Sequence, residues 1–189
     1  MDPKMKLDLA EDRGEKELKD IKGYQAIVGS LMCAALATRP VIPFAVPALC
    51  QYNSRPFTSH LTATKRVLQY LKSTADFRLH FSSPGSSTGS NDQLTGYTDS
   101  NWANDSADRT SQGSHVFLLS NGAVLWQSRK QDLIAMSTLE AKYIACSEGS
   151  HEAKWLPQLH RDIYTAKMHL RSRSIVTIRV HLVISQLGS

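Results

Sequence analysis

The stretch LTGYTDSNW, residues 94–102, predicts a short β-strand with an acidic side chain, Asp99, close to its end. A second acidic side chain, Glu140, follows in STLEAKY, residues 137–143. Ser137 is a good helix N-cap, and Glu140 stands three residues later as in a capping box, which predicts the start of a helix. Two carboxylates that converge from a strand end and a helix start can hold Mg²⁺, a cation that prefers oxygen ligands. With further acidic ligands they can hold two ions about 3.5–4 Å apart, the arrangement that hydrolyses phosphodiesters.

The same two residues also have a simpler interpretation. Glu140 can serve only as the capping-box partner of Ser137, and Asp99 only as a turn former, because caps and turns are common uses of acidic side chains. The spacing of the residues leaves both interpretations open.

Around this pair the sequence predicts a mixed sheet covered by helices, which is an α/β (α+β) fold. Three strands are predicted, at residues 94–99, 114–119 and 123–128. The last two are joined by Ser120-Asn121-Gly122, and its Asn-Gly step is typical of hairpins. Two helices and a final strand are predicted after them, at residues 137–149, 151–164 and 175–180.

The first part of the chain is predicted to be mainly helical. Apolar residues recur at three- and four-residue intervals over residues 24–35. Arg39-Pro40 ends this helix, because a proline disfavours helical geometry in the residue before it. A second helix or irregular apolar segment is predicted up to Tyr52, and a third helix is predicted with Thr58 or Ser59 as its N-cap.

The domain boundary is predicted in residues 82–93, a stretch of Ser, Gly and Pro that cannot bury apolar area. Residues 1–22 are predicted to be a frayed or disordered tail, residues 23–81 a helical domain, and residues 94–189 the sheet domain. Alternating apolar residues at 77–81 predict one more short strand.

The composition is that of a globular protein, with 189 residues of which 41% are hydrophobic. The start of the chain is too charged for a signal peptide, and prolines interrupt its most apolar runs. We therefore expect an intracellular protein, in the cytoplasm or nucleus, without a membrane span. Three widely spaced cysteines argue against disulfides or a zinc site and are predicted to be buried, reduced thiols.

Charge is unevenly distributed along the chain. Residues 1–81 have twelve basic and eight acidic side chains, residues 82–166 have six and nine, and residues 167–189 have four and none. Basic flanks suit a polyanion partner and an acidic centre suits a bound cation. Surface charges that are merely solvated explain the same distribution, and composition does not decide between the two.

Residues 95–156, TGYTDSNWANDSADRTSQGSHVFLLSNGAVLWQSRKQDLIAMSTLEAKYIACSEGSHEAKWL, resemble the ribonuclease H domain of copia-type retrotransposon polyproteins. Upstream, YQAIVGSLMCAALATRP and HLTATKRVLQYLKSTADFRLHF resemble the end of the reverse transcriptase that precedes that domain. The resemblance covers about residues 23–164. It implies a ribonuclease H-like mixed sheet with flanking helices, preceded by a mainly helical segment. It also implies cleavage of the RNA strand of RNA/DNA hybrids with Mg²⁺ or Mn²⁺, and as partners the hybrid and the rest of the polyprotein.

Carried over residue by residue, the resemblance implies that Asp99 and Glu140 are catalytic metal ligands. The basic helix of the family lies near template and primer, and here the matching residues are His60, Lys65, Arg66 and Lys72. Those residues contact nucleic acid or form a solvated face. Arg109 and Ser111 fall in the family's turn before the second strand. The resemblance implies that they either contact phosphate or only form the turn. The tryptophans match positions expected in the core, at Trp102, Trp126 and Trp155.

The sequence departs from the family at the remaining metal ligands. The third ligand of the family is an aspartate at the end of a later strand, and His181 stands in its place. Neutral imidazole suits Mg²⁺ poorly because it offers nitrogen and no charge. The chain ends at Ser189, before the last helix of the family and the fourth metal-site residue. We therefore expect absent or weak nuclease activity, with Mg²⁺ or Mn²⁺ weakly held.

Two other functions remain open. A non-catalytic module could hold nucleic acid through its basic helix and basic tail, with binding that weakens steeply as salt is added. Alternatively, the chain is the product of a decayed reading frame that folds poorly, because the loss of the family's last helix leaves an apolar sheet face uncovered.

Overall fold

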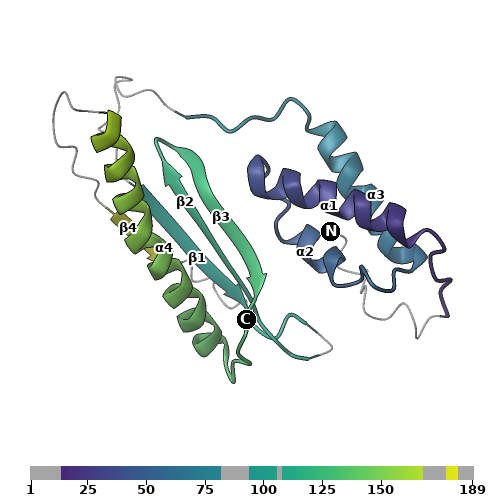
Figure 1. Cartoon of the computed structure of the whole chain (residues 1–189). Helices are drawn as coiled ribbons and strands as arrows, with labels where there is room; N and C mark the ends of the chain where they lie inside the picture. Colours follow the sequence, from purple (N-terminus) through teal and green to yellow (C-terminus); the bar gives the residue numbers. More distant parts are fainter. Residues whose placement is uncertain (1–13, 82–93, 106–107, 168–177, 183–189) are drawn as a thin grey trace. The chain divides into compact units, whose positions relative to one another are not determined.

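The computed structural model describes residues 14–81, 94–105, 108–167 and 178–182, which belong to two units, Met1–Arg78 and Leu79–Ser189 (Figure 1). The first unit contains α1 (Ile21–Ala37), α2 (Ala45–Cys50) and α3 (Thr58–Ser73). The second contains β1 (Leu94–Asn101), β2 (Gln112–Leu119), β3 (Gly122–Lys130), α4 (Thr138–Lys167) and β4 (Ile178–Leu182). A helical segment thus precedes a unit of mixed sheet and helix, which confirms the predicted α+β class. Within the described residues, no helix combines the length and apolar character that a membrane span requires.

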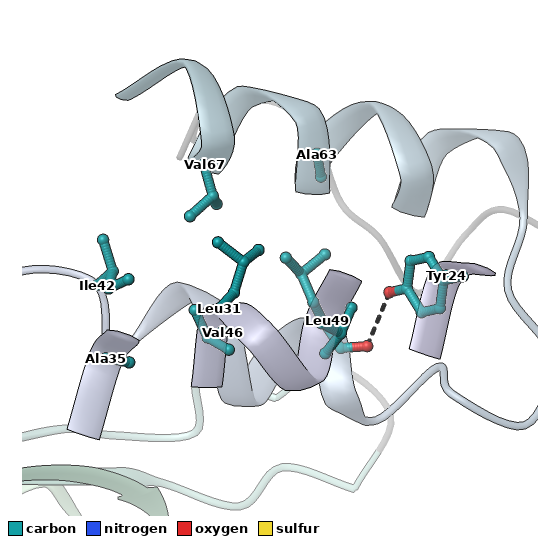
Figure 2. Packing of buried hydrophobic residues seen from close by; sticks show 9 residues of the cluster. Tyr24, Leu31, Ala35, Ile42, Val46, Leu49, Ala63 and Val67 are labelled. Atoms are coloured by element: carbon teal, nitrogen blue, oxygen red, sulfur yellow. Dashed lines mark hydrogen bonds between the residues drawn. The ribbon is translucent and has the colours of Figure 1, made fainter. Parts of the chain in front are cut away.

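The first unit is a small helical core built by one face of α1. Tyr24, Val28, Leu31 and Ala35 are buried, and their spacing places them on one side of the helix. Residues of α2 and α3 close the core from the other side (Figure 2). The Asp20 side chain caps α1 by accepting a hydrogen bond of 2.9 Å from the backbone N–H of Gly23. The helix ends just before Arg39-Pro40, as the sequence predicts.

The segment just before α1 is packed against the start of α3. The prediction of a frayed or disordered tail is therefore wrong for this segment. The backbone N–H of Leu18 donates to the carbonyl of Pro56 at 2.8 Å, and the N–H of Thr58 donates to the carbonyl of Lys16 at 3.2 Å. Residues 1–13 lie outside the described residues. The helical unit therefore includes residues that sequence composition alone assigns to a disordered tail.

The N-cap of α3 is Phe57, not Thr58 or Ser59 as the sequence predicts. A phenylalanine side chain has no hydrogen-bond acceptor for the free N–H groups of the first turn. The carboxylate of Glu15 supplies one instead, since it accepts a hydrogen bond of 3.1 Å from the backbone N–H of Ser59. A cap that comes from a distant residue leaves no local pattern in the sequence.

Tyr24 makes the stability of the helical unit sensitive to alkaline pH. Its hydroxyl donates a hydrogen bond of 2.9 Å to the carbonyl of Leu49, and burial raises the pKa of Tyr24 from 10.0 to about 12 (Figure 2). The unfolded chain therefore loses this proton near pH 10 while the folded unit keeps it. We expect the free energy of unfolding to fall as the pH rises from about 10 to about 12. Below about pH 10 Tyr24 adds no pH dependence, because it is protonated in both the folded and the unfolded chain.

Urea unfolding followed by far-UV circular dichroism, at pH 8 and at pH 11, measures this loss. Tyr24→Phe removes the ionisable group and is expected to abolish the tyrosine's share of the loss, at a cost of about 1 kcal/mol at pH 8 for the missing hydrogen bond. An alkaline loss of equal size in both proteins would contradict the assignment. Tyr70→Phe, which changes an exposed tyrosine on α3, is the matched control.

The sheet of the second unit has the strand order β3-β2-β1-β4. β1, β2 and β3 are antiparallel neighbours, and β4 lies parallel to β1, so the predicted mixed sheet is confirmed. Of the final strand predicted at 175–180, the structure describes residues from Ile178 on and continues the strand to Leu182. Residues 175–177 lie outside the described residues.

The predicted hairpin is confirmed, although its turn lies one residue earlier than the Asn-Gly step. Leu119 pairs with Gly122, so Ser120 and Asn121 form the two-residue loop. Both loop residues have positive φ, 51° and 63°, as a type I′ turn requires. Gly122 begins β3, and a side chain there would overlap the ring of Phe81.

The strand predicted at 77–81 is wrong. These residues have no regular secondary structure, and the side chains of Phe77 and Phe81 are exposed. Alternation describes which side chains share a face, but a strand also needs a neighbouring strand for its backbone hydrogen bonds. No such neighbour pairs with residues 77–81 in the part of the chain that the structure describes.

One continuous helix of 30 residues, α4, replaces the two predicted helices. Gly149, where a break is predicted, lies inside it at a point of close packing: a Cβ at this position would lie 3.4 Å from the Cβ of Thr98. The hydroxyl of Thr98 donates a hydrogen bond of 3.0 Å to the carbonyl of Ala145 on the same helix. Figure 1 shows α4 lying along the sheet. Gly149 therefore brings α4 close to β1, and Pro157 is accommodated within the helix.

Several side chains predicted to be buried lie at the surface. Trp102 and Trp155 are exposed, although Trp102 donates a hydrogen bond of 2.9 Å to the carbonyl of Ala135. Trp126 is half-buried. The three cysteines are free thiols, but Cys33 is exposed and the other two are half-buried, so the prediction that all three are buried is wrong.

Candidate metal and nucleic-acid site

Asp99 lies near the end of β1, opposite Ser114 of β2. The neighbouring side chain, Thr98, points to α4, where its hydroxyl binds the carbonyl of Ala145. Successive side chains of a strand alternate between faces, so Asp99 lies on the sheet face turned away from α4. Its Oδ1 accepts a hydrogen bond of 2.8 Å from the backbone N–H of Ser100.

Glu140 lies in the first turn of α4, with an exposed side chain. Its Oε2 accepts a hydrogen bond of 2.7 Å from the backbone N–H of Met136, and its own N–H donates to Oγ of Ser137 at 3.2 Å. The predicted start of the helix at Ser137 is confirmed, and Glu140 has the capping role of the simpler interpretation. This role occupies one carboxylate oxygen, while the other accepts no hydrogen bond from the described residues.

The two carboxylates do not by themselves make a two-ion site. Asp99 and Glu140 are each held by neighbours in sequence, and no direct interaction joins them among the described residues. In the same residues no group of three or more His, Cys, Asp or Glu side chains could hold a metal ion. Mg²⁺ demands near-octahedral oxygen coordination, and the two-ion mechanism needs ligands for both ions. Asp99 and Glu140 therefore supply fewer ligands than a two-ion site needs.

The backbone of β4 shows where position 181 lies. His181 pairs with Tyr97, and Leu182 pairs with Thr98, in the parallel ladder between β4 and β1. His181 thus lies within β4, beside the residue of β1 that comes two positions before Asp99. The resemblance places the third acidic ligand at this position, beside the strand that carries the first.

The basic helix divides into exposed and buried residues. Lys65, Arg66 and Lys72 are exposed on α3 and remain candidates for nucleic-acid contacts. His60, grouped with them on sequence, is 0% exposed and stacks on Tyr52 with ring centroids 3.9 Å apart. Its Nδ1 accepts a hydrogen bond of 2.9 Å from the backbone N–H of Phe57. A contact between His60 and nucleic acid does not fit this position, and the histidine instead completes the start of α3.

The turn before β2 places its two candidate residues differently. Arg109 is exposed and has a positive φ of 59°. Ser111 is 0% exposed; its Oγ accepts a hydrogen bond of 3.2 Å from the N–H of Ala103, and its carbonyl accepts one of 2.8 Å from the N–H of Gln131. A phosphate cannot reach Ser111 in this position. The arrangement matches the turn role that the sequence left open, and only Arg109 remains a candidate phosphate contact.

Lys130 holds this turn in place. Its Nζ lies 2.6 Å from a carboxylate oxygen of Asp105 and 2.6 Å from one of Asp108. Hydrogen bonds from Lys130 and Thr110 lower the pKa of Asp108 to about 2. The turn therefore keeps its charged contacts at neutral pH.

A polar cavity of about 310 Å³ was not anticipated from the sequence. It lies between β2, β3 and α4, and its titratable lining residues include His115, Glu148, His151 and Glu152. The last three are spaced so that they share one side of a helix, which a sequence can reveal. The pattern is missed when a helix break is predicted at Gly149, because the break places Glu148 on a different helix from His151 and Glu152.

The fold and the site define the class of this protein. It has a helical unit followed by an α+β unit, and the α+β unit carries one carboxylate on a central strand and another at the start of its helix. No family model matches the chain, and no solved structure matches it. Over 133 residues, 70% of this chain and 90% of the relative, it is 41% identical to "Secreted RxLR effector protein 161" of Plasmopara viticola.

Two further relatives are retrotransposon polyproteins. The chain is 39% identical over 140 residues to the "Retrovirus-related Pol polyprotein from transposon TNT 1-94" of Nicotiana tabacum, covering 74% of this chain and 10% of that protein. The chain is also 35% identical over 143 residues to the "Retrovirus-related Pol polyprotein from transposon RE2" of Arabidopsis thaliana. This match covers 76% of this chain and 9% of that protein. The chain belongs to the family of copia-type retrotransposon Pol polyproteins. It spans about a tenth of the length of these two polyproteins.

Proposed function

We propose that residues 94–189 are a ribonuclease H-like domain of a copia-type element, that this domain has little or no cleavage activity, and that the chain as a whole binds RNA/DNA hybrids. The helical unit before it corresponds to the end of the element's reverse transcriptase. The observation that carries the proposal is the position of two acidic residues in the fold, Asp99 on central strand β1 and Glu140 in the first turn of α4, the helix that packs on β1. The relatives support it because they are Pol polyproteins.

The reduced set of ligands is the physical reason for weak cleavage. Phosphodiester hydrolysis by two ions needs one ion to activate water and another to stabilise the leaving oxygen. Asp99 and Glu140 provide two carboxylates, and the position of a third is occupied by His181. Each missing carboxylate lowers the affinity for Mg²⁺, because ligand charge and number set the strength of binding.

Nucleic-acid binding depends on a different set of residues. Lys65, Arg66 and Lys72 are exposed on α3, and Arg109 is exposed in the turn before β2. Phosphates attract such side chains through charge, and the release of counterions makes the binding depend on salt. We place the protein inside the cell, in the cytoplasm or nucleus, with nucleic acid and the rest of the polyprotein as its partners.

Salt-dependent binding of a labelled RNA/DNA hybrid tests this proposal. The affinity is expected to fall steeply with salt, and the slope of log K against log[salt] is expected to become shallower by about 0.9 for each phosphate contact removed. We therefore expect a shallower slope for the variant Lys65→Ala/Arg66→Ala/Lys72→Ala. Lys19→Ala, which removes an exposed charge outside α3, is the control. No binding at low salt, or an unchanged slope in the triple variant, would exclude the basic helix as the contact surface.

An effector function is the alternative that one relative's name raises. That relative is 41% identical and is covered over 90% of its length. The 189 residues contain no Arg-x-Leu-Arg sequence, so the motif in that name is not among them. The carboxylate pair and the polyprotein relatives therefore favour the hybrid-binding domain.

A further inference from the structure

The cavity between β2, β3 and α4 lies apart from the carboxylate pair. His115 of β2 pairs with Thr98 of β1 and shares its sheet face, the one covered by α4. Asp99 lies on the opposite face. The cavity has a volume of about 310 Å³, and α4 contributes Glu148, His151 and Glu152 to its lining. It is therefore a second polar site within the same unit, and its size is near the lower limit of small-molecule pockets.

His115 is the most buried polar group of this cavity. Its side chain is 8% exposed, and neither ring nitrogen makes a hydrogen bond among the described residues. Burial lowers the pKa of His115, while Glu152 and Glu148 oppose this effect. The ring is therefore neutral at pH 7, with one nitrogen able to accept a hydrogen bond. A ligand that donates a hydrogen bond would give this acceptor nitrogen a partner.

The charges around His115 are only partly balanced. Arg129 of β3 lies 3.0 Å from the carboxylate of Glu148 and 3.5 Å from that of Asp132, so its positive charge is compensated. The carboxylate of Glu152 makes no ion pair or hydrogen bond among the described residues. Glu152 and the neutral His115 therefore leave the cavity with one uncompensated negative charge and a free acceptor nitrogen.

These features select the kind of ligand. The described residues hold no group of three or more His, Cys, Asp or Glu side chains with the geometry of a metal site, which disfavours a metal ion. A primary ammonium group combines a compact positive charge with three N–H donors. We propose that this cavity binds the primary ammonium group of a small ligand, with Glu152 as its ion-pair partner and the ring of His115 as a hydrogen-bond acceptor.

Calorimetric titration of the full chain with n-butylammonium tests the proposal. n-Butyltrimethylammonium has the same charge but no N–H donors, and its affinity is expected to be at least tenfold lower. Glu152→Gln removes the charge while keeping the shape, and it is expected to weaken n-butylammonium at least tenfold. Asp162→Asn, which removes an exposed carboxylate of α4 outside the cavity lining, is the control and is expected to leave the affinity unchanged.

His115→Phe keeps a ring in the cavity but removes the acceptor. This variant is expected to lose the preference for n-butylammonium over the trimethylated compound. Acidification that protonates His115 is expected to weaken binding in the wild type, because the protonated ring faces Glu148, Glu152, His151 and Arg129 and takes the place of the ligand's charge. The Glu152→Gln result alone decides the ion-pair contact if the histidine variant does not fold.

Two further probes distinguish the source of the ammonium group. Tighter binding of 1,4-diaminobutane than of N-acetyl-lysine amide would indicate a free amine, and the reverse would indicate the lysine side chain of a peptide. The proposal is overturned if none of these amines binds saturably at millimolar concentration, if the trimethylated compound binds equally well, or if Glu152→Gln leaves the affinity unchanged.

Discussion

Replacing Phe117 by alanine is expected to lower the free energy of unfolding of the sheet unit by about 3–5 kcal/mol. Phe117 is 1% exposed in β2 and packs in the core with Leu94 and Ala153. Its ring lies against Gly96 of β1, where an added Cβ would overlap it. Because the glycine has no side chain to move into the space, the alanine variant is left with a cavity that its neighbours fill poorly.

Urea unfolding monitored by tryptophan fluorescence measures this loss. All three tryptophans lie between residues 102 and 155, so the fluorescence reports on the sheet unit. Leu133→Ala, at an exposed position, is the control and is expected to change the stability by less than about 0.5 kcal/mol. Equal losses in the two variants would show that Phe117 is not a core residue. A wild-type transition without cooperativity would instead favour the product of a decayed reading frame.

Leu49→Ala is expected to destabilise the helical unit by about 2–5 kcal/mol. Leu49 lies in α2, is 0% exposed and packs among the residues drawn in Figure 2. α2 has only six residues, so packing and not intrinsic helix stability must hold it in place. The hydrogen bond from Tyr24 goes to the backbone carbonyl of Leu49, and the substitution keeps that acceptor. The loss therefore measures packing alone.

Far-UV circular dichroism during urea unfolding detects this change, because residues 1–78 contain no tryptophan. Leu36→Ala removes the same side chain from an exposed position of α1 and is the matched control. We expect the control to stay within about 0.5 kcal/mol of the wild type. A control as unstable as Leu49→Ala would mean that the helices do not pack as described.

The sequence predicts those elements whose cause is local. The spacing of Tyr24, Val28 and Leu31 predicts α1, and Ser137 with Glu140 predicts the start of α4. The hairpin between β2 and β3 follows from short-range turn chemistry, because Asn121 tolerates a positive φ. In each case the residues that decide the structure are neighbours in sequence.

The predictions that are wrong depend on distant contacts. In the sequence Gly149 suggests the end of a helix. In the structure the close approach of Thr98 gives another reason for a glycine there. Glu15 caps α3 from more than forty residues away, and His60, on a helix with basic residues, is buried by Tyr52. Sequence periodicity contains no information on such contacts, since tertiary packing decides them.

The candidate site was predicted in part. The structure places Asp99 and Glu140 on the strand and the helix start where they were expected. It buries Ser111 and reveals the cavity around His115, because both depend on how β2 meets its neighbours. Motif order can locate the carboxylates, whereas exposure and cavities follow from the packed chain.

Cleavage of a labelled RNA/DNA hybrid by the purified full chain is the most direct test of the central claim, that the chain binds such hybrids and has a depleted metal site. We predict no cleavage above background with either Mg²⁺ or Mn²⁺, because Asp99 and Glu140 supply only half of the ligands that two ions need. Asp99→Asn is the control, since it removes a carboxylate with little change in shape. Cleavage by the wild type that Asp99→Asn abolishes would contradict the account.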